Sequence, residues 1–351
     1  MSTRALRRVP AILTISLALG AVAPTVATAE GPIVAWGNNS YGQLDVPGGD
    51  TFTMIAAGGN HGLALKADGS LVAWGWNSEG QTDVPGGDDF IDIAAGGQHN
   101  LALRADGTLA GWGWNSDGQT DVPSGDDYVA VAAGDLHSLA LREDGSIAGW
   151  GWNLFGQAFP PPGAEYAQIA AGGVHSLALR NDGSIIGWGS NGDGQISVPP
   201  GNDYTAVAAG DYHSLALKDD GSIVGWGANN YGQTNVPDGN DFVAVAAGFG
   251  FSLALKEDGE IVAWGTNYAG QTDAPDGRTH AAIAAGYAHG IALVGEFPEI
   301  PGDIDGDGDV DTADLLALLG AWGDCPGCPE DLNGDDVVNT EDLLILLGNW
   351  G

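Results

Sequence analysis

Basic residues are scarce in this chain of 351 residues, which holds ten Lys and Arg residues against 46 Asp and Glu residues. The formal net charge of −36 at pH 7 repels nucleic acid and anionic membrane surfaces. Nucleic acid is therefore excluded as a partner, whereas calcium or a cationic partner suits this charge.

Long apolar runs are also rare, and the longest, from Ala11 to Ala23, lies near the start of the chain. Three basic residues precede this run, and the small residues Ala27–Thr28–Ala29 follow it as a candidate cleavage site. This order is typical of a secretory signal peptide, so we expect residues 1–29 to be removed and the protein to be extracellular, in solution or at a cell surface. The mature charge would then be about −39, because the segment holds three basic and no acidic residues. No later segment approaches the ~20 apolar residues of a spanning helix, so membrane insertion is not expected.

Sequence motifs of catalytic sites are nearly absent. Neither Gly-x-Ser-x-Gly nor His-Glu-x-x-His occurs. The segment Gly187–Gly192 matches a dinucleotide-binding fingerprint, but no helical pattern follows it. Acidic pairs such as Asp88–Asp89 recur at one repeat position, which the repeat explains better than a catalytic dyad does. These absences favour a non-catalytic protein.

Glycine, by contrast, is abundant at 59 residues, and it belongs to a repeat. The dipeptide Trp-Gly recurs every 38 residues, at Trp36, Trp74, Trp112, Trp150, Trp188, Trp226 and Trp264. Gly-Gln and Ala-Ala-Gly recur with the same period. A fixed period in this range is typical of a propeller or a solenoid.

Each period has the pattern of a small antiparallel sheet of three or four strands. The segment Ser214–Lys218 alternates as a half-buried strand does, and Asp220–Gly221 then separates it from the next strand, Ser222–Trp226. Asp-Gly between two apolar runs is a strong hairpin signal, because glycine accepts the positive φ of the turn.

The two ends of the repeat region distinguish a propeller from a solenoid. The first Trp-Gly strand, Ile33–Gly37, has no preceding hairpin partner, and the last strand, Gly290–Val294, has no following one. Joining the two completes a seventh sheet and removes two exposed edges. We therefore expect an all-β, seven-bladed β-propeller of 38-residue repeats over residues 30–296.

The repeat resembles that of the regulator of chromosome condensation family, as residues 208–227 illustrate most clearly. The 38-residue period is similar to that of the compact bacterial branch, of the β-lactamase inhibitory protein II type. The resemblance implies a propeller fold. For function it implies less, although a secreted enzyme inhibitor is one alternative.

Some positions of the repeat are candidates for function. A histidine recurs in six of the seven repeats, and these histidines form either a metal-binding ring or packing contacts. A Lys or Arg recurs just before the Asp-Gly turn, and it is either a solvated charge or part of an anion-binding site. Trp76, Trp114 and Trp152 break the repeat at one loop position, and Phe155 adds a ring in the same sector. They form either a partner-binding patch or a packing feature.

Beyond a Pro/Glu linker at 297–301, residues 302–351 contain two acidic twelve-residue loops, each followed by a short apolar helix. Acidic and amide residues at this spacing are typical of EF-hand calcium loops, so two calcium ions are expected. In the second loop Asp336 replaces the glycine of position 6, so this site is expected to be the weaker. The candidate ligands are Asp303, Asp305, Asp307, Asp309, Asp311 and Asp314 in the first loop, and Asp331, Asn333, Asp335, Val337 (by its carbonyl), Asn339 and Asp342 in the second.

Two such units in tandem resemble a type I dockerin, which implies calcium-dependent docking to a cohesin domain of another protein. The dockerin positions of partner choice correspond to Thr312, Ala313, Thr340 and Glu341. Between the copies, Cys325 and Cys328 are expected to form a small disulfide.

These observations predict a secreted, non-catalytic binding or assembly protein. Its propeller would bind a protein or glycan, and its dockerin-like module would attach it to a cohesin-type partner. The alternatives are a polysaccharide-degrading enzyme delivered by the module, or a secreted enzyme inhibitor.

Overall fold

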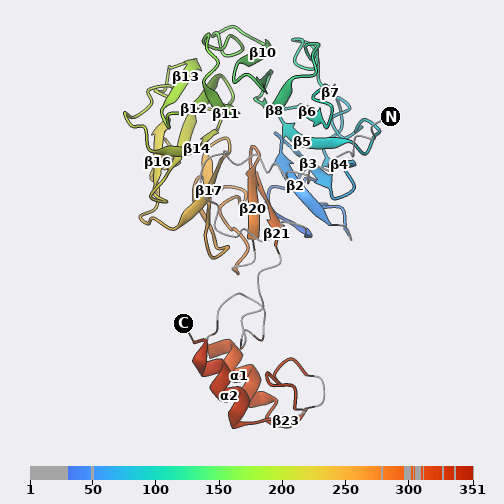
Figure 1. Cartoon of the computed structure of the whole chain (residues 1–351), viewed down its shortest axis with the longest axis vertical. Coiled ribbons are helices and arrows are strands. Elements are labelled where there is room, and N and C mark those ends of the chain that lie inside the picture. The colour runs from blue at the N-terminus through green and yellow to red at the C-terminus, as the bar shows by residue number, and fades with distance from the viewer. Residues whose placement is uncertain are drawn as a thin grey trace, which may run out of the picture.

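The computed structural model describes residues 31–48, 51–277, 280–295, 302, 304, 310, 312–325, 328–335 and 337–350. These residues form seven three-stranded antiparallel sheets, and Figure 1 shows the sheets arranged in a ring as a β-propeller. The expected signal peptide and the expected linker lie outside the described residues.

Each sheet, or blade, has an inner, a middle and an outer strand. The inner strands are β2 (Phe52–Ala57), β5 (Phe90–Ala95), β8 (Tyr128–Ala133), β11 (Tyr166–Ala171), β14 (Tyr204–Ala209), β17 (Phe242–Ala247) and β20 (His280–Ala285). The middle strands are β3 (His61–Lys66), β6 (His99–Arg104), β9 (His137–Arg142), β12 (His175–Arg180), β15 (His213–Lys218), β18 (Phe251–Lys256) and β21 (His289–Val294). The outer strands are β4 (Leu71–Gly75), β7 (Leu109–Gly113), β10 (Ile147–Gly151), β13 (Ile185–Gly189), β16 (Ile223–Gly227), β19 (Ile261–Gly265) and β1 (Ile33–Gly37).

The predicted closure of the ring is confirmed. Strand β1 pairs antiparallel with β21 so that Trp36 lies opposite Gly290, and β20 completes this blade. The indole Nε1 of Trp36 donates to the carbonyl of Gln271, 3.0 Å away in the preceding blade. The first strand of the ring therefore closes the last blade.

One hydrogen bond between blades explains why Trp-Gly and Gly-Gln recur together. The indole of Trp150 donates to the carbonyl of Gln119 at 2.9 Å, and the other six repeat tryptophans make the same bond. The Gln119 side chain is buried, and its Oε1 accepts the backbone N–H of Asp117. Each repeat thus fixes its loop and presents an acceptor to the next blade.

The apolar core lies between neighbouring blades. In one such layer Leu177 and Leu179 of β12 pack with Tyr204 and Val207 of β14 and with Trp226 of β16. Similar layers recur around the ring, so each blade buries both of its faces.

The ring has two chemically different ends. At the turn end, Asp-Gly hairpins join middle to outer strands, with Gly69 at a φ of 83° and the Asp68 carboxylate accepting the N–H of Ser70. The opposite end holds the Ala-Ala-Gly segments and the loops that follow Trp-Gly, and we call it the pocket end. These segments are held together by hydrogen bonds such as Trp76 N–H to Asn60 O.

The C-terminal residues form a separate small core. Helices α1 (Thr312–Gly320) and α2 (Thr340–Gly348) contact each other, and the short strands β22 (Gly323–Asp324) and β23 (Val337–Val338) pair antiparallel. The core buries one valine and one leucine from each copy, namely Val310, Leu318, Val338 and Leu346. A disulfide joins Cys325 to Cys328. Neither this pair of helices nor any other described segment forms a helix long and apolar enough to cross a membrane.

Candidate functional site

The repeated histidines bond one blade to the next. The Nε2 of His137 lies 2.8 Å from the Ser176 hydroxyl of the next blade. Ser176 occupies the same repeat position as Ser138, whose hydroxyl donates to the Gln119 carbonyl. The same contact recurs at His61, His99, His175 and His213. Burial lowers the pKa of His137 to about 3, so the ring stays neutral at physiological pH. This arrangement favours the packing interpretation over a metal-binding ring.

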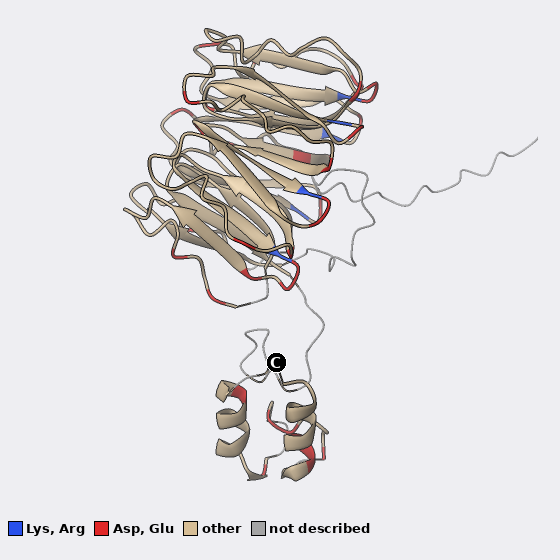
Figure 2. Cartoon of the chain, turned by 90° about the vertical axis from the view of Figure 1, so that its left-hand side faces the viewer, with Lys and Arg blue, Asp and Glu red and all other residues tan. Residues whose placement is uncertain are grey.

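The repeated basic residues are paired rather than free. Figure 2 shows that the Lys and Arg residues lie along one end of the ring, near acidic residues. Lys218 lies 2.9 Å from Asp203, and its ammonium also lies over the ring of Tyr204. Arg104, Arg142, Arg180 and Lys256 have equivalent partners at Asp89, Asp127, Glu165 and Asp241. Glu165, an isolated acid in the sequence, is thus one of these partners.

The three loop tryptophans lie at the pocket end, where each is half-buried. Trp76 stacks at a tilt against Tyr41, with ring centroids 5.4 Å apart, and Trp152 meets Phe155 edge-on at 5.5 Å. The indole N–H of Trp114 is buried and has no acceptor among the described residues. These rings therefore both pack on the blade and present surface to solvent.

Exposed apolar side chains extend this surface. Leu154, Phe155 and Phe159 are exposed on the loop between β10 and β11. Tyr41, Tyr231 and Tyr268 are exposed on equivalent loops of other blades. All of the Lys and Arg residues that the structure describes lie at the opposite, turn end. The pocket end is thus aromatic and free of basic side chains within the described part.

A cavity of about 60 Å³ opens at the axis of the ring, where the seven Ala-Ala-Gly segments converge. Backbone bonds link its wall from blade to blade, as in Gly97 N–H to Gly134 O and Gly173 N–H to Gly210 O. Most of the lining is Ala and Gly, and the chemistry comes from Asp135, Asp211 and Tyr287.

Two carboxylates meet in this cavity. A Cβ on Gly173, which stands between them, would lie 3.1 Å from Asp135 Oδ2 and 3.0 Å from Asp211 Cα. Burial raises the pKa of Asp135 to about 6, although a hydrogen bond with Tyr287 opposes the rise. Burial, and then the charge of Asp135, raise the pKa of Asp211 well above its usual range.

One aromatic ring, that of Tyr287, lines the cavity with the two carboxylates, and two more rings follow it. The ring of Tyr287 occupies space left by Gly59 and Gly97, where a Cβ would lie 2.7 Å and 2.8 Å from its atoms. Phe249 lies beside it with centroids 6.3 Å apart at 72°, and Tyr212 meets Phe249 at 6.1 Å and 83°. Each of the three rings therefore stands nearly perpendicular to its neighbour, and Tyr287 is the one that lines the cavity.

Sequence reasoning missed this cavity, although a signal was present. The position after Ala-Ala-Gly breaks the repeat as the tryptophan position does, with the residues Gly59, Gly97, Asp135, Gly173, Asp211, Phe249 and Tyr287. A polar or aromatic residue there is not required by the blade. The ring axis brings all seven positions together, which spacing along the chain alone does not indicate.

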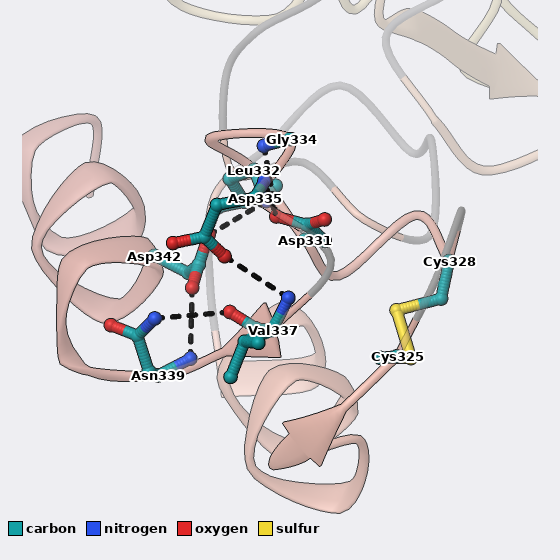
Figure 3. Close-up of a disulfide and its surroundings, with 9 residues drawn as sticks. All are labelled: Cys325, Cys328, Asp331, Leu332, Gly334, Asp335, Val337, Asn339 and Asp342. Carbon is teal, nitrogen blue, oxygen red and sulfur yellow. Dashed lines mark hydrogen bonds between the residues drawn. A yellow bond between two sulfur atoms is a disulfide. The ribbon is translucent and has the colours of Figure 1, made fainter.

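In the C-terminal part, side-chain oxygens of the second candidate calcium loop accept hydrogen bonds from the backbone of the same loop (Figure 3). The Asp342 carboxylate is fully buried and accepts the N–H groups of Leu332 and Asn339 at 2.9 and 2.8 Å. Asp331 accepts the N–H of Gly334, and Asp335 accepts that of Val337. Asn339 instead caps α2, because its Oδ1 accepts the N–H of Glu341.

The first candidate loop lies mostly outside the described residues, which include none of Asp303, Asp305, Asp307, Asp309 and Asp311. Asp314 is described, and it repeats the geometry of Asp342. Its carboxylate is fully buried and accepts the N–H of Ile304 at 2.6 Å. The predicted partner-choice residues Thr312, Ala313, Thr340 and Glu341 are all exposed at the starts of α1 and α2.

The fold and its repeated contacts define a β-propeller built from tandem 38-residue repeats. The family model of the regulator of chromosome condensation (RCC1) repeat matches residues 53–81, 90–119, 128–157, 166–195, 204–233 and 242–271. These segments make up half of the chain, so the protein belongs to this family. No curated protein matches the chain.

Several solved structures share the fold. Prp20p of Saccharomyces cerevisiae is 18% identical with a TM-score of 0.66, over 81% of this chain and 94% of that one. Human WBSCR16 is also 18% identical, with a TM-score of 0.64 over 77% and 100% of the two chains. The CRINKLY WD40 ectodomain of the Arabidopsis thaliana receptor kinase ACR4 is 25% identical, with a TM-score of 0.57 over 68% and 88%.

Proposed function

We propose that this chain is a secreted, non-catalytic binding and assembly protein. The pocket end of its propeller binds a protein or glycan target, and its C-terminal module docks calcium-dependently to a cohesin-type partner. The observation that carries the proposal is the collection of exposed aromatic side chains at one end of the ring, around an acidic cavity. Aromatic side chains of this kind dominate binding interfaces and stack on sugars.

The equivalent positions in other blades show which residues can replace the three tryptophans in a test. Blade positions equivalent to Trp76, Trp114 and Trp152 carry Asn38, Ser190, Ala228 and Thr266, so the fold accepts small polar residues there. The triple variant Trp76→Ser, Trp114→Ser and Trp152→Ser should keep its melting temperature within a few degrees. It should also capture less target from the source culture in a calcium-containing pull-down.

The control for this pull-down is Arg142→Gln, which changes the turn end and should leave capture intact. A triple variant that captures as much target as the unmodified protein refutes the role of the tryptophans. A triple variant that unfolds shows that the three rings serve packing instead.

For the C-terminal module, the second loop offers the kind of oxygen ligands that calcium takes. Asp331, Asn333, Asp335 and Asp342 accept backbone N–H groups of the loop, Val337 offers a carbonyl, and no Lys or Arg lies in residues 302–351 of the sequence. Calcium, which takes 6–8 oxygen ligands, would neutralise the carboxylates of this loop. The corresponding acidic residues of the first loop would hold a second ion. The exposed Thr312, Ala313, Thr340 and Glu341 would then face the partner.

Calcium binding has its own measurement. Chelation by EDTA should remove helical signal at 222 nm, because the like charges of each loop would no longer be neutralised, and added calcium should restore it. The β-sheet signal of the propeller should not change, and magnesium at equal concentration serves as the control. Identical spectra with EDTA and with calcium would refute calcium-dependent folding of the module.

The enzyme alternative has one observation in its favour, since Asp135 and Asp211 are carboxylates that break the repeat and converge. Their cavity of about 60 Å³ is, however, far smaller than the ~300–1,000 Å³ of small-molecule sites. A whole sugar substrate does not fit between them, whereas the end of one side chain does. The geometry therefore supports binding better than glycoside hydrolysis.

A further inference from the structure

The axial cavity holds two carboxyl groups, and no basic side chain is among the residues that line it. Asp211 is 92% buried, as its exposed fraction is 8%, and it accepts no hydrogen bond from any residue the structure describes. Asp135 has only the Tyr287 hydroxyl as a donor. The six described Lys and Arg residues all lie at the turn end, five of them in ion pairs with acidic residues there. A buried, unpartnered carboxylate is costly unless a ligand pairs with it.

We propose that this cavity binds the cationic end of a Lys or Arg side chain that a partner protein inserts along the axis of the propeller. This inference rests on the proposed function, because it names an anchor within the target that the pocket end binds. Asp135 and Asp211 supply the acceptors, and Tyr287, the first of three neighbouring aromatic rings, lines the cavity beside them.

The aromatic rings favour an organic cation over water alone. A cation near the face of a Tyr or Phe ring is attracted by the ring quadrupole, and cages of such rings are a known means of recognising alkylammonium groups. Tyr287 lines the cavity, and Phe249 and Tyr212 follow it edge-on, at angles of 72° and 83° between successive rings. The aliphatic stem of a Lys or Arg would contact these rings while its charged end reaches the carboxylates.

A metal ion fits this cavity less well. Calcium requires 6–8 oxygen ligands, whereas the cavity offers two carboxylates and one phenol as side-chain donors. Within the described residues, three acidic, His or Cys ligands come close enough together to hold a metal only at Cys325, Cys328 and Glu330, and there the two cysteines are joined to each other.

The volume agrees with a side-chain end. The cavity of about 60 Å³ is several times the ~10–15 Å³ that one water molecule requires, and it is well below that of a small-molecule site. The wall cannot widen easily at five of its seven blade boundaries, because backbone hydrogen bonds connect the residues after Ala-Ala there.

The test uses three blocked peptides and the full-length protein in calcium-containing buffer. The probes are acetyl-Gly-Lys-Gly-amide, acetyl-Gly-Arg-Gly-amide, and the same peptide with norleucine, which keeps the four-carbon chain of lysine and lacks its ammonium group. The Lys and Arg peptides should shift the backbone amide resonances of Gly97, Gly173 and Asp211 to saturation, and the norleucine peptide should not.

Asp211→Asn and Asp135→Asn keep the shape of the cavity and remove its charge. Each should weaken Lys-peptide binding about tenfold or more, as the loss of a charge-assisted hydrogen bond does. Both variants should fold and melt no lower than the unmodified protein, because each removes a buried carboxylate from its like-charged neighbour. Asp92→Asn, which removes a buried carboxylate outside the cavity, should bind the peptide normally.

Equal binding of the norleucine and Lys peptides, or unchanged Lys-peptide binding by the double Asn variant, overturns the proposal. So does a calcium titration that shifts the same three amides without peptide, since it assigns the cavity to a metal. If the double Asn variant still captures the target in the pull-down that the tryptophan variant fails, the cationic anchor is refuted while the binding face stands.

Discussion

Replacement of Asp92 by Asn is expected to stabilise the propeller by about 4 kcal/mol above pH 7 and to change its stability little near pH 4. The Asp92 side chain is buried in the inner strand β5, and its Oδ2 accepts the N–H of Val131 from the next blade at 3.1 Å. Burial raises its pKa from 3.8 to about 7, and the hydrogen bonds from Val131 and Ile93 only partly oppose the rise.

The direction of the effect follows from the raised pKa. The folded state holds the proton of Asp92 more tightly than the unfolded state, so its stabilising contribution is complete below pH 3.8 and is lost as pH rises through 7. Raising the pKa of Asp92 from 3.8 to about 7 corresponds to about 4 kcal/mol in the free energy of unfolding. This is an upper figure, because Asn keeps only one of the two acceptor oxygens.

Gln168 provides the matched control for Asp92. It occupies the same repeat position in β11, where its neutral Oε1 accepts the N–H of Val207 at 3.0 Å. The reciprocal change Gln168→Asp should therefore introduce a loss of stability between pH 4 and 7. Urea unfolding midpoints at pH 4, 5, 6, 7 and 8 measure both variants, and midpoints for Asp92→Asn that run parallel to those of the unmodified protein would refute the reasoning.

Three further predictions concern the histidines between blades. Burial lowers the pKa of these rings from 6.5 to about 3 for His99 and about 4 for His213. Their contribution to stability is therefore complete above pH 6.5 and is lost as pH falls toward 4. A urea midpoint that stays constant over this range would contradict this prediction. Ser176→Ala removes the partner of His137 and a donor to Gln157, and should cost about 1–3 kcal/mol in the free energy of unfolding. His289 has no side-chain partner, and in the blade after it the repeat position of Ser176 holds Gly62. Phe251 is fully buried, and in the blade after it the same position holds Gly290. His289→Phe should thus raise the melting temperature, whereas His137→Phe should lower it.

The blades could be predicted because the same sequence signals recur in every repeat. The 38-residue spacing predicts the blades, Asp-Gly predicts the hairpins, and the complementary ends predict the pairing of β1 with β21. The repeat pattern does not indicate which residues form hydrogen bonds across each blade boundary. The bond of Trp36 to Gln271, for example, connects residues that only the closed ring brings together.

The axial cavity was not predicted for the same physical reason. Asp135 and Asp211 lie 76 positions apart in the sequence, and each reads as an ordinary turn residue beside a strand. Their shared burial exists only because every inner strand ends at one axis. Asp92 is similar, since its position between two blades, and not its residue type, raises its pKa.

The pairing of β1 with β21 also has a consequence for the order of folding. It joins Trp36 to Gly290, so the last sheet cannot form until nearly the whole propeller has left the ribosome. Until then β1 remains an unpaired edge, and contacts this distant in sequence form slowly. Ring completion is therefore the natural late step of folding, and the nascent chain is most open to aggregation just before it occurs.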